Sequence, residues 1–256
     1  MNRFWTVEEK KLLRQLYLEE NLPIAQIALR LGRTTASINT VLAKFGIPRT
    51  RCLPKFQFPN QMTPTLARIH AHVCGDGHLF VTRERDHYGY LSVYRQGYYR
   101  RRYGFGYTNL NSTLLQSFVS DVKNILGLTP HYNLKRWGVA FRSKPAWELL
   151  KILGAGKSRE WKIHSDILQA PDPVKIAWVK AFFDDEAHFV PHGGIRVRSV
   201  NRPGLEQLAS MLRQFIPCHL TPEHGLYPDD SCYLVVPKAA RAHFLQLIGS
   251  TKFPSP

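Results

Sequence analysis

Apolar residues recur at helical spacing through the first part of the chain and predict three helices within residues 1–50. Thr6 and Glu9 form a capping box that begins the first helix. Gly32 ends the second helix, and Thr34 is placed to cap the third. The side chains expected to face inward are Leu12, Leu13, Leu16, Tyr17, Ile24, Ile27, Ala28, Leu31, Ile38, Val41, Leu42 and Phe45. A small all-α unit is therefore expected.

The order of helix, glycine turn and helix is the helix-turn-helix pattern, in which the last helix enters the DNA major groove. The outward residues of the third helix are small or polar and suit groove contacts: Thr35, Ser37, Asn39, Thr40 and Lys44. A small helical bundle used for protein contact is the alternative. The basic charge of the chain favours DNA.

Residues 51–64 are rich in proline and begin with basic side chains. Proline makes a segment stiff and extended, and the basic residues attract phosphate. We therefore expect a linker between the helical unit and the rest of the chain.

The hydrophobic pattern then repeats, with one copy at residues 65–170 and the second at 171–256. Each copy opens with a helix of small and apolar residues that ends in an acid, Asp76 or Glu186, 110 residues apart (186 − 76). Strands are expected near 79–82, 103–107, 131–134, 139–141, 189–190, 195–200, 219 and 232–236, with further helices near 112–126, 145–153, 203–215 and 239–248. Both copies therefore predict the order αββαββα.

Lysines match between the two copies. Lys157 and Lys252 each follow a glycine by three residues at the end of a copy. Lys144 and Lys238 each open the last helix of a copy. These matches in register argue against chance similarity between the copies.

The chain has 256 residues, 44% of them apolar, and a formal net charge of +16. This composition predicts a folded protein of one or two domains that binds a polyanion, with nucleic acid ahead of an anionic membrane surface. A merely soluble basic protein is the alternative. The sequence has no apolar run of membrane-spanning length, no signal peptide and no Cys-x-x-Cys pair. An intracellular protein, in the cytoplasm or nucleoid, is expected.

Asp76 and Glu186 are predicted at the C-terminal ends of two helices that can pack closely. Paired carboxylates suit a hard divalent cation, and the C-terminal ends of helix dipoles also favour a cation. The alternative is that both acids are surface charges. Acids are unfavourable at a helix C-terminus, so two matched placements argue against that alternative.

These two motifs and the order of elements that follows them resemble the LAGLIDADG homing endonucleases, in the form that carries two motifs on one chain. The resemblance covers residues 65–256. It implies an α+β fold of two αββαββα halves about a pseudo-twofold axis, with the motif helices packed at that axis. It also implies a monomer whose two sheets form a saddle on double-stranded DNA, and a divalent metal, Mg²⁺ with Mn²⁺ substituting.

By position, the resemblance makes Asp76 and Glu186 the metal ligands. Asn109 takes the place of an amide that contacts metal-bound water, and Ser199 is its weaker counterpart in the second copy. Lys157 and Lys252 are expected beside the cleavage site and, with Asp76, Glu186 and Asn109, form the candidate catalytic set.

The second motif departs from the family pattern. It has Ala187 where glycine commonly closes a helix with positive φ, so the second metal position is expected to be less well placed. Asp184 is expected to cap a helix or to form a salt bridge in the interface. Met1 and Pro256 differ from the splicing residues of inteins of this family, which favours a free-standing enzyme.

Basic residues on and between the expected strands are candidate DNA contacts. Residues 83–102 interleave arginines with tyrosines, which suits contact with the DNA backbone, although a solvated hairpin is the alternative. Alternation places Arg196 and Arg198 on the same face of one sheet. The candidates are Arg83, Arg85, Arg95, Arg100, Lys135, Arg142, Lys144, Arg196, Arg198 and Lys238.

His70, His72, Cys74 and His78 crowd the first motif and suggest a zinc site. The second copy has no equivalent cluster, so histidines packed in the core are the preferred interpretation. The function predicted from the sequence is a site-specific, metal-dependent double-strand DNA endonuclease. The alternative is a non-cleaving binder of the same fold, such as an RNA maturase or transcription regulator. The charge disfavours a protein-interaction scaffold.

Overall fold

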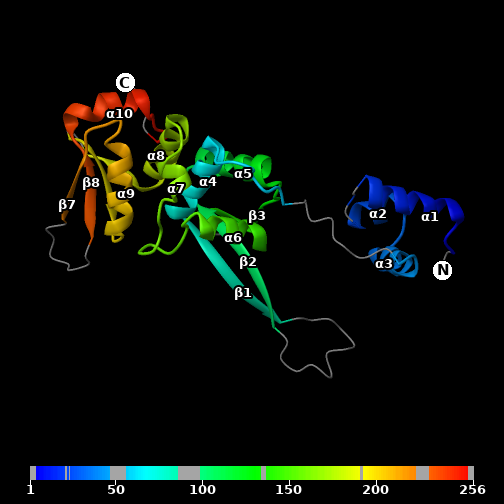
Figure 1. Cartoon of the computed structure of the whole chain (residues 1–256). Coiled ribbons are helices and arrows are strands. Elements are labelled where there is room, and N and C mark those ends of the chain that lie inside the picture. Colours follow the sequence, from blue (N-terminus) through cyan, green and yellow to red (C-terminus); the bar gives the residue numbers. More distant parts are fainter. Residues whose placement is uncertain are drawn as a thin grey trace. The chain divides into compact units, whose positions relative to one another are not determined.

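The chain divides into two compact units, residues 1–55 and 56–256 (Figure 1). The computed structural model describes residues 4–20, 22, 24–46, 56–85, 99–133, 137–190, 193–222 and 231–252. Within these ranges, no helix combines the length and the apolar character needed to cross a membrane.

The first unit consists of helices α1 (Val7–Arg14), α2 (Ile24–Leu31) and α3 (Thr35–Lys44), with a π-helical turn η1 (Gln15–Glu19) that continues α1. The capping box is present, since the Thr6 hydroxyl accepts from Glu9 N and the Glu9 carboxylate accepts from Thr6 N. The buried apolar side chains are Leu13, Leu16, Tyr17, Ile27, Ala28, Ile38, Val41 and Leu42. The inward placement predicted for Leu12 and Phe45 was wrong. Leu12 lies at the edge of the apolar face of α1, and Phe45 follows the last turn of α3.

The second unit contains the predicted αββαββα order twice. The first half comprises α4 (Pro64–Cys74), β1 (Gly77–Arg85), β2 (Tyr99–Thr108), α5 (Ser112–Leu126), β3 (His131–Asn133), β4 (Gly138–Arg142) and α6 (Lys144–Ile152). The second half comprises α8 (Asp172–Glu186), β5 (Ala187–Phe189), β6 (Ile195–Ser199), α9 (Arg202–Leu212), β7 (His219–Pro222), β8 (Cys232–Val236) and η4 (Lys238–Ala240) with α10 (Arg241–Leu247). A short helix, α7 (Ser165–Leu168), lies between the halves in the sequence.

The two sheets share one topology. The strand orders are β1-β2-β4-β3 and β5-β6-β8-β7, and all neighbouring strands are antiparallel. Gly77 pairs with Tyr107 in the first sheet, and Ala187 pairs with Val197 in the second. This register makes Asp76 and Glu186 equivalent positions of the repeat, and likewise Gly75 and Asp185, and Asn109 and Ser199.

Helices cover one face of each sheet and leave the other face to solvent. In β6, Ile195 and Val197 are fully buried, whereas Arg196 and Arg198 are exposed, as strand alternation predicts. In the first sheet, Phe105 and Tyr107 face the core. Each half therefore presents a sheet surface that its own core does not use.

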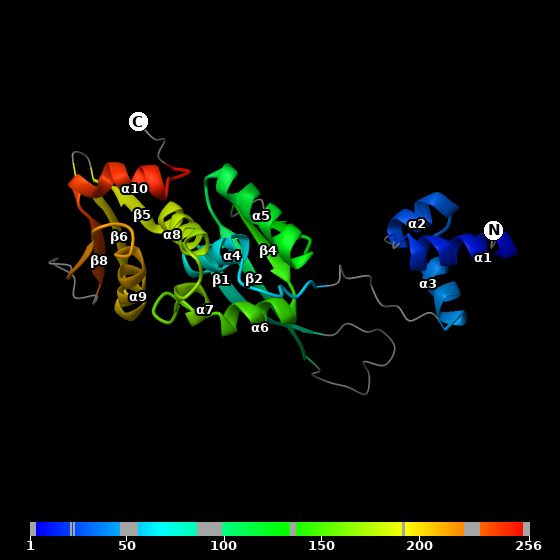
Figure 2. The same cartoon turned by 45° about the horizontal axis from the view of Figure 1, so that its top comes forward.

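Helices α4 and α8 pack directly against each other between the two sheets (Figure 2). The Trp178 indole on α8 donates to Nδ1 of His70 on α4 at 2.9 Å, and burial lowers the pKa of His70 to about 3. His70 is therefore a neutral core residue. The burial of His70 and His72 fits the core interpretation for these two histidines, whereas His78 is exposed.

Candidate metal and nucleic-acid site

The ends of α4 and α8 bring Asp76 and Glu186 within electrostatic reach of each other. Asp76 follows α4 after the capping Gly75, and Glu186 is the last residue of α8. Burial, and then the charge of Asp185, raises the pKa of Asp76 to about 6, although part of its side chain reaches solvent. Burial, and then the charge of Asp76, raises the pKa of Glu186 to about 7. Carboxylates whose ionisation is opposed by burial and by a neighbouring acid form a site that a cation would stabilise.

Lys252 supplies positive charge at this site. Its ammonium donates to the main-chain carbonyl of Asp185 at 2.7 Å, and its charge lowers the pKa of both Asp76 and Glu186. The structure therefore brings Lys252 together with the two acids.

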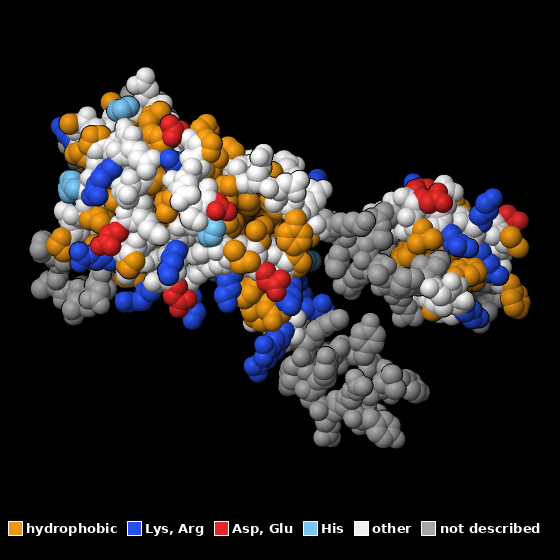
Figure 3. All heavy atoms as spheres, viewed as in Figure 1, with side chains coloured by type: hydrophobic (Ala, Val, Ile, Leu, Met, Phe, Trp, Pro, Cys, Tyr) orange, Lys and Arg blue, Asp and Glu red, His pale blue; other side chains and the backbone are white. Residues whose placement is uncertain are grey.

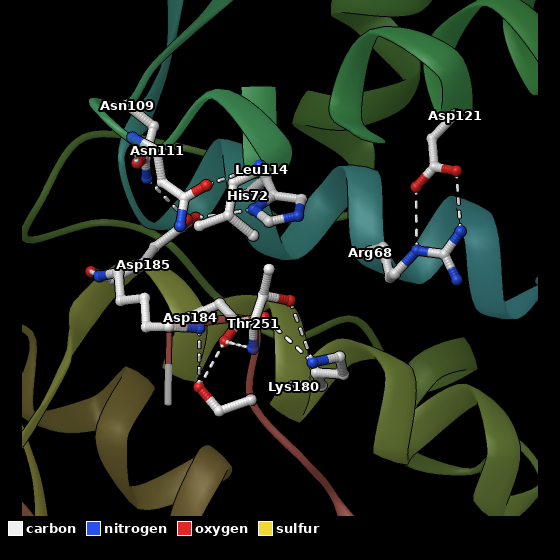
Figure 4. Close-up of polar contacts among 12 residues, drawn as sticks. Arg68, His72, Asn109, Asn111, Leu114, Asp121, Lys180, Asp184, Asp185 and Thr251 are labelled. Atoms are coloured by element: carbon white, nitrogen blue, oxygen red, sulfur yellow. Dashed lines mark hydrogen bonds and ion pairs between the residues drawn. The ribbon is translucent and has the colours of Figure 1, made fainter. Parts of the chain in front are cut away.

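Asp184 ties the segment that carries Lys252 to α8 (Figure 4). Its buried carboxylate accepts from the Ser250 hydroxyl at 2.9 Å and from Thr251 N at 2.7 Å. Its other oxygen lies 3.3 Å from Lys180 Nζ. Asp184 thus forms a salt bridge, but within α8 rather than across the interface, where the bridge was expected.

Asn109 follows β2 and is buried against the first acid. Its Nδ2 donates to Asp76 Oδ2 at 2.8 Å, and its Oδ1 accepts from Asn111 N at 2.9 Å. The second half keeps this turn, because the Ser199 hydroxyl accepts from Asn201 N at 3.1 Å. Asn111 and Asn201 then cap α5 and α9. A serine reaches less far than an asparagine, so only the first half shows an amide bonded to its acid among the described contacts.

Asp185 belongs to the same cluster, although the sequence analysis did not select it. Its side chain is fully buried, accepts from the Tyr107 hydroxyl at 2.6 Å and lies 2.9 Å from His72 Nδ1. The signal in the sequence was the run Asp184-Asp185-Glu186, three consecutive acids at an apolar helix end.

Two cavities flank Gly75 at the end of α4. One, of about 360 Å³, is lined by Glu186, Arg198 and Ser199 together with Ser158. The other, of about 420 Å³, is lined by Gly77, His78, Lys157 and Ser158 among others. Lys157 is exposed at the edge of this second cavity, whereas its counterpart Lys252 is bonded beside the acids.

No protein-family model and no curated protein matches the sequence. Solved structures match the fold. A structure of mesophilic variants of the homing endonuclease I-DmoI has a TM-score of 0.56 at 14% identity, covering 77% of this chain and 95% of that chain. I-DmoI in complex with DNA and Mn has a TM-score of 0.53 at 14% identity, covering 73% and 96%.

The chain has the LAGLIDADG homing endonuclease fold. Residues 56–252 supply both halves of this fold, with α4 and α8 as the paired motif helices. The small helical unit at residues 4–46 precedes them in the sequence.

Ala187, at the end of the second motif, does not have the positive φ at which glycine commonly closes a helix. It has φ −81° and ψ 147°, ordinary extended backbone, because α8 runs directly into β5. The positive φ from which the sequence argument started is absent here, and a less well placed second metal position stays a prediction. Gly77, its counterpart, is needed for a close approach, since a Cβ there would lie 2.5 Å from Val73 Cα.

The solvent faces of the LAGLIDADG sheets carry several candidate DNA contacts. Arg196 and Arg198 are exposed on β6, with the Arg196 guanidinium 6.0 Å from the centre of the Tyr233 ring. Lys and Arg side chains gather along the lower edge of the larger unit in Figure 3, where the strands lie. Arg83, Arg142, Lys144 and Lys238 are also exposed, at β1, the end of β4 and the starts of α6 and η4. Arg85 and Arg100 lie on the paired ends of β1 and β2, and Arg95 and Lys135 lie outside the described residues.

The candidate DNA-contacting residues on α3 differ in their exposure and in whether their side chains already form hydrogen bonds within the helical unit. Thr35 and Lys44 are exposed, and Asn39 is half-buried. Ser37 accepts from the Trp5 indole at 3.0 Å, so its hydroxyl also holds the N-terminal segment to α3. Thr40 donates to the Ala36 carbonyl within the helix.

Proposed function

We propose that the chain is a site-specific endonuclease that cuts both strands of DNA by metal-dependent phosphodiester hydrolysis. The observation that carries this proposal is the placement of Asp76 and Glu186 at the ends of two packed helices. Burial and the charge of a neighbouring acid raise the pKa of each, the neighbour being Asp185 for Asp76 and Asp76 for Glu186. The fold supports it, because I-DmoI has been solved in complex with DNA and Mn, and in complex with DNA and Ca.

The residues at the site fit a divalent cation. Asp76 and Glu186 offer hard oxygen donors of the kind that Mg²⁺ prefers, with Mn²⁺ as a substitute, and the charge of Lys252 offsets only part of their repulsion. A bound cation supplies charge neutralisation at the phosphate and activates water. Asn109 holds the Asp76 carboxylate, and Lys252 stabilises the negative charge that develops on the phosphate.

The DNA-binding surface in this proposal is the solvent face of the two sheets. Arg142, Arg196 and Arg198 lie there, on a chain of net charge +16. Residues Thr35, Ser37, Asn39 and Lys44 of α3 add contacts from the helical unit. One chain supplies both motif helices, so a monomer suffices, and an intracellular DNA target fits the composition.

The second candidate is a non-cleaving nucleic-acid binder such as an RNA maturase or a transcription regulator. One observation favours it: the second motif carries Asp185-Glu186-Ala187 where the first carries Gly75-Asp76-Gly77.

Affinity selection followed by metal addition separates the two. Genomic DNA fragments are selected on the immobilised full chain without metal and then incubated with Mg²⁺. Wild type and the control Asp172→Asn, an exposed first-turn acid of α8, should select fragments and cut them. Asp76→Asn should select the same fragments and leave them whole. Intact fragments with wild type would favour the second candidate, and RNA would then replace DNA in the selection.

A further inference from the structure

Asp185 is a buried carboxylate at the crossing of α4 and α8, and three side chains from the first half converge on it. Figure 4 labels two of them, His72 and Asn109. His72 Nδ1 lies 2.9 Å from Oδ2, the Tyr107 hydroxyl donates to Oδ1 at 2.6 Å, and Asn109 Nδ2 lies 3.4 Å from Oδ1. The carboxylate of this second-half residue thus meets side chains of the first half, whereas its main-chain carbonyl accepts from Lys252.

Gly75 makes room for this carboxylate. A Cβ at Gly75 would lie 2.9 Å from both Cβ and Oδ2 of Asp185, closer than real Cβ contacts. Gly75 and Asp185 are equivalent positions of the repeat, so one helix contributes a glycine and the other an acid to the same crossing. The first half has no such acid, and the arrangement breaks the symmetry of the two motifs.

A chain of hydrogen bonds runs from Asp185 to Asp76. The Tyr107 hydroxyl donates its hydrogen bond to Asp185, so its oxygen is left to accept from Asn109 Nδ2 at 3.0 Å. The same Asn109 nitrogen donates to Asp76 at 2.8 Å. Asn109 Oδ1 is occupied by Asn111 N, so a flipped amide would lose bonds at both ends.

We propose that Asp185 is a positioning residue that orients the Asp76 carboxylate through Tyr107 and Asn109 and adds a third negative charge to the divalent-cation site. The inference rests on the proposed function for its metal. The charge of Asp185 opposes ionisation of both Asp76 and Glu186, so a cation bound there is attracted by three carboxylates. Groups that hold a metal ligand in place commonly change metal affinity by roughly 10- to 100-fold.

The test is Mn²⁺ affinity of the full chain, measured by electron paramagnetic resonance titration together with the melting temperature. Asp185→Asn keeps the side-chain shape, and we expect its Mn²⁺ affinity to fall by roughly 10- to 100-fold while melting stays cooperative. The matched control is Asp121→Asn. Asp121 is also a buried acid that holds α4, through Arg68 at 2.7 Å, but it lies outside the cluster (Figure 4). The Asp121→Asn variant should melt at a lower temperature than wild type and keep the wild-type Mn²⁺ affinity.

Two further variants keep the test sharp if Asp185→Asn folds poorly. Tyr107→Phe removes one hydroxyl from the hydrogen-bond chain and should lose part of the affinity. The exchange Gly75→Ala with Asp185→Gly relieves the crowding at the helix crossing while removing the carboxylate, and it should lose as much affinity as Asp185→Asn.

The proposal is overturned if Asp185→Asn and the exchange variant bind Mn²⁺ as tightly as wild type, or if Asp121→Asn weakens binding equally. If Asp185→Asn weakens Mn²⁺ binding but the wild-type protein never cuts DNA, the inference about Asp185 is supported and the proposed endonuclease function is rejected. If the wild-type protein cuts DNA but Asp185→Asn binds Mn²⁺ as tightly as wild type, only the inference about Asp185 is rejected. Wild type without Mn²⁺ affinity overturns both.

Discussion

The Lys252 ammonium donates to the main-chain carbonyl of Asp185 at 2.7 Å, at the end of α8. The last carbonyls of a helix have no partner within it and favour a cation. Lys252 therefore provides a hydrogen-bond donor for a carbonyl at the end of α8, and the same position puts its charge close to Asp76 and Glu186. Its counterpart in the repeat, Lys157, is exposed.

This difference predicts that the two lysines contribute unequally to cutting. Lys252→Met should slow single-turnover cleavage by roughly 10²- to 10³-fold, the usual effect of losing a group that stabilises transition-state charge. Lys157→Met should slow cleavage less. The rates are measured separately for each strand of a cleaved site. Equal losses from the two substitutions would contradict the unequal placement.

Asp184 should affect the cleavage rate indirectly, because it holds the segment that positions Lys252. Asp184→Ala removes the acceptor for Ser250 and Thr251 and should cost about 1 to 3 kcal/mol of stability. The same change should slow cleavage, and a double-mutant cycle with Lys252→Met should show that the two losses overlap rather than add.

The control for this cycle is Glu206→Ala. Glu206 forms an exposed pair with Arg202, so its loss should change stability by less than about 0.5 kcal/mol and leave cleavage unaltered. Additive losses from Asp184→Ala and Lys252→Met would show that Asp184 does not position the lysine.

The pKa values of Asp76 and Glu186 predict how stability without metal depends on pH. Folding raises them from 3.8 to about 6 and from 4.5 to about 7, so between about pH 4 and pH 7 the folded state binds more protons than the unfolded state. Stability from these groups is full below pH 4 and is lost as pH rises through 6 and 7.

Asp76→Asn removes one of the opposing charges and should therefore raise the metal-free melting temperature at pH 7.5. The expected rise is about 2 to 4 °C, as about 1 kcal/mol gives in a protein of this size, because solvent screens part of the repulsion. The difference should vanish at pH 4. Mn²⁺ should stabilise wild type at pH 7.5 and not Asp76→Asn. A variant that melts below wild type at pH 7.5 would contradict the prediction.

Arg196 and Arg198 should read bases from the solvent face of the second sheet. Alanine at either position is expected to cost about 1 to 3 kcal/mol of binding and to relax sequence preference at a few neighbouring positions. Arg202→Ala on α9 is the comparison. Affinity selection of a randomised target followed by sequencing measures both effects. Uniform weakening at all sequences would assign the two arginines to the phosphate backbone instead.

The repeat could be predicted because its signals are local. The helix expected at 112–126 and the strand expected at 232–236 coincide with α5 and β8, where apolar periodicity is strong and caps are clear. The strands expected at 79–82 and 103–107 extend further, to Gly77–Arg85 and Tyr99–Thr108. Their outer parts are rich in arginine and lack the hydrophobic pattern that indicates a strand.

The cluster around Asp185 could not be predicted, because it depends on how α4 crosses α8. The sequence has an acid at residue 185 and a glycine at residue 75. Only the tertiary packing shows that the missing side chain of Gly75 leaves room for the Asp185 carboxylate. The same holds for Lys252, whose bond to the Asp185 carbonyl depends on Asp184 holding the neighbouring segment. The π-helical turn Gln15–Glu19 likewise has no sequence signal that we recognised.

Capture of new DNA ends from pooled genomic DNA incubated with the full chain and Mg²⁺ tests the central claim most directly. We predict discrete ends on both strands at one or a few sequences with wild type, and none with Asp76→Asn or Glu186→Gln. The same ends with either variant, or no discrete ends with wild type on DNA that it binds, would contradict the assignment of these two acids to a metal-dependent cut.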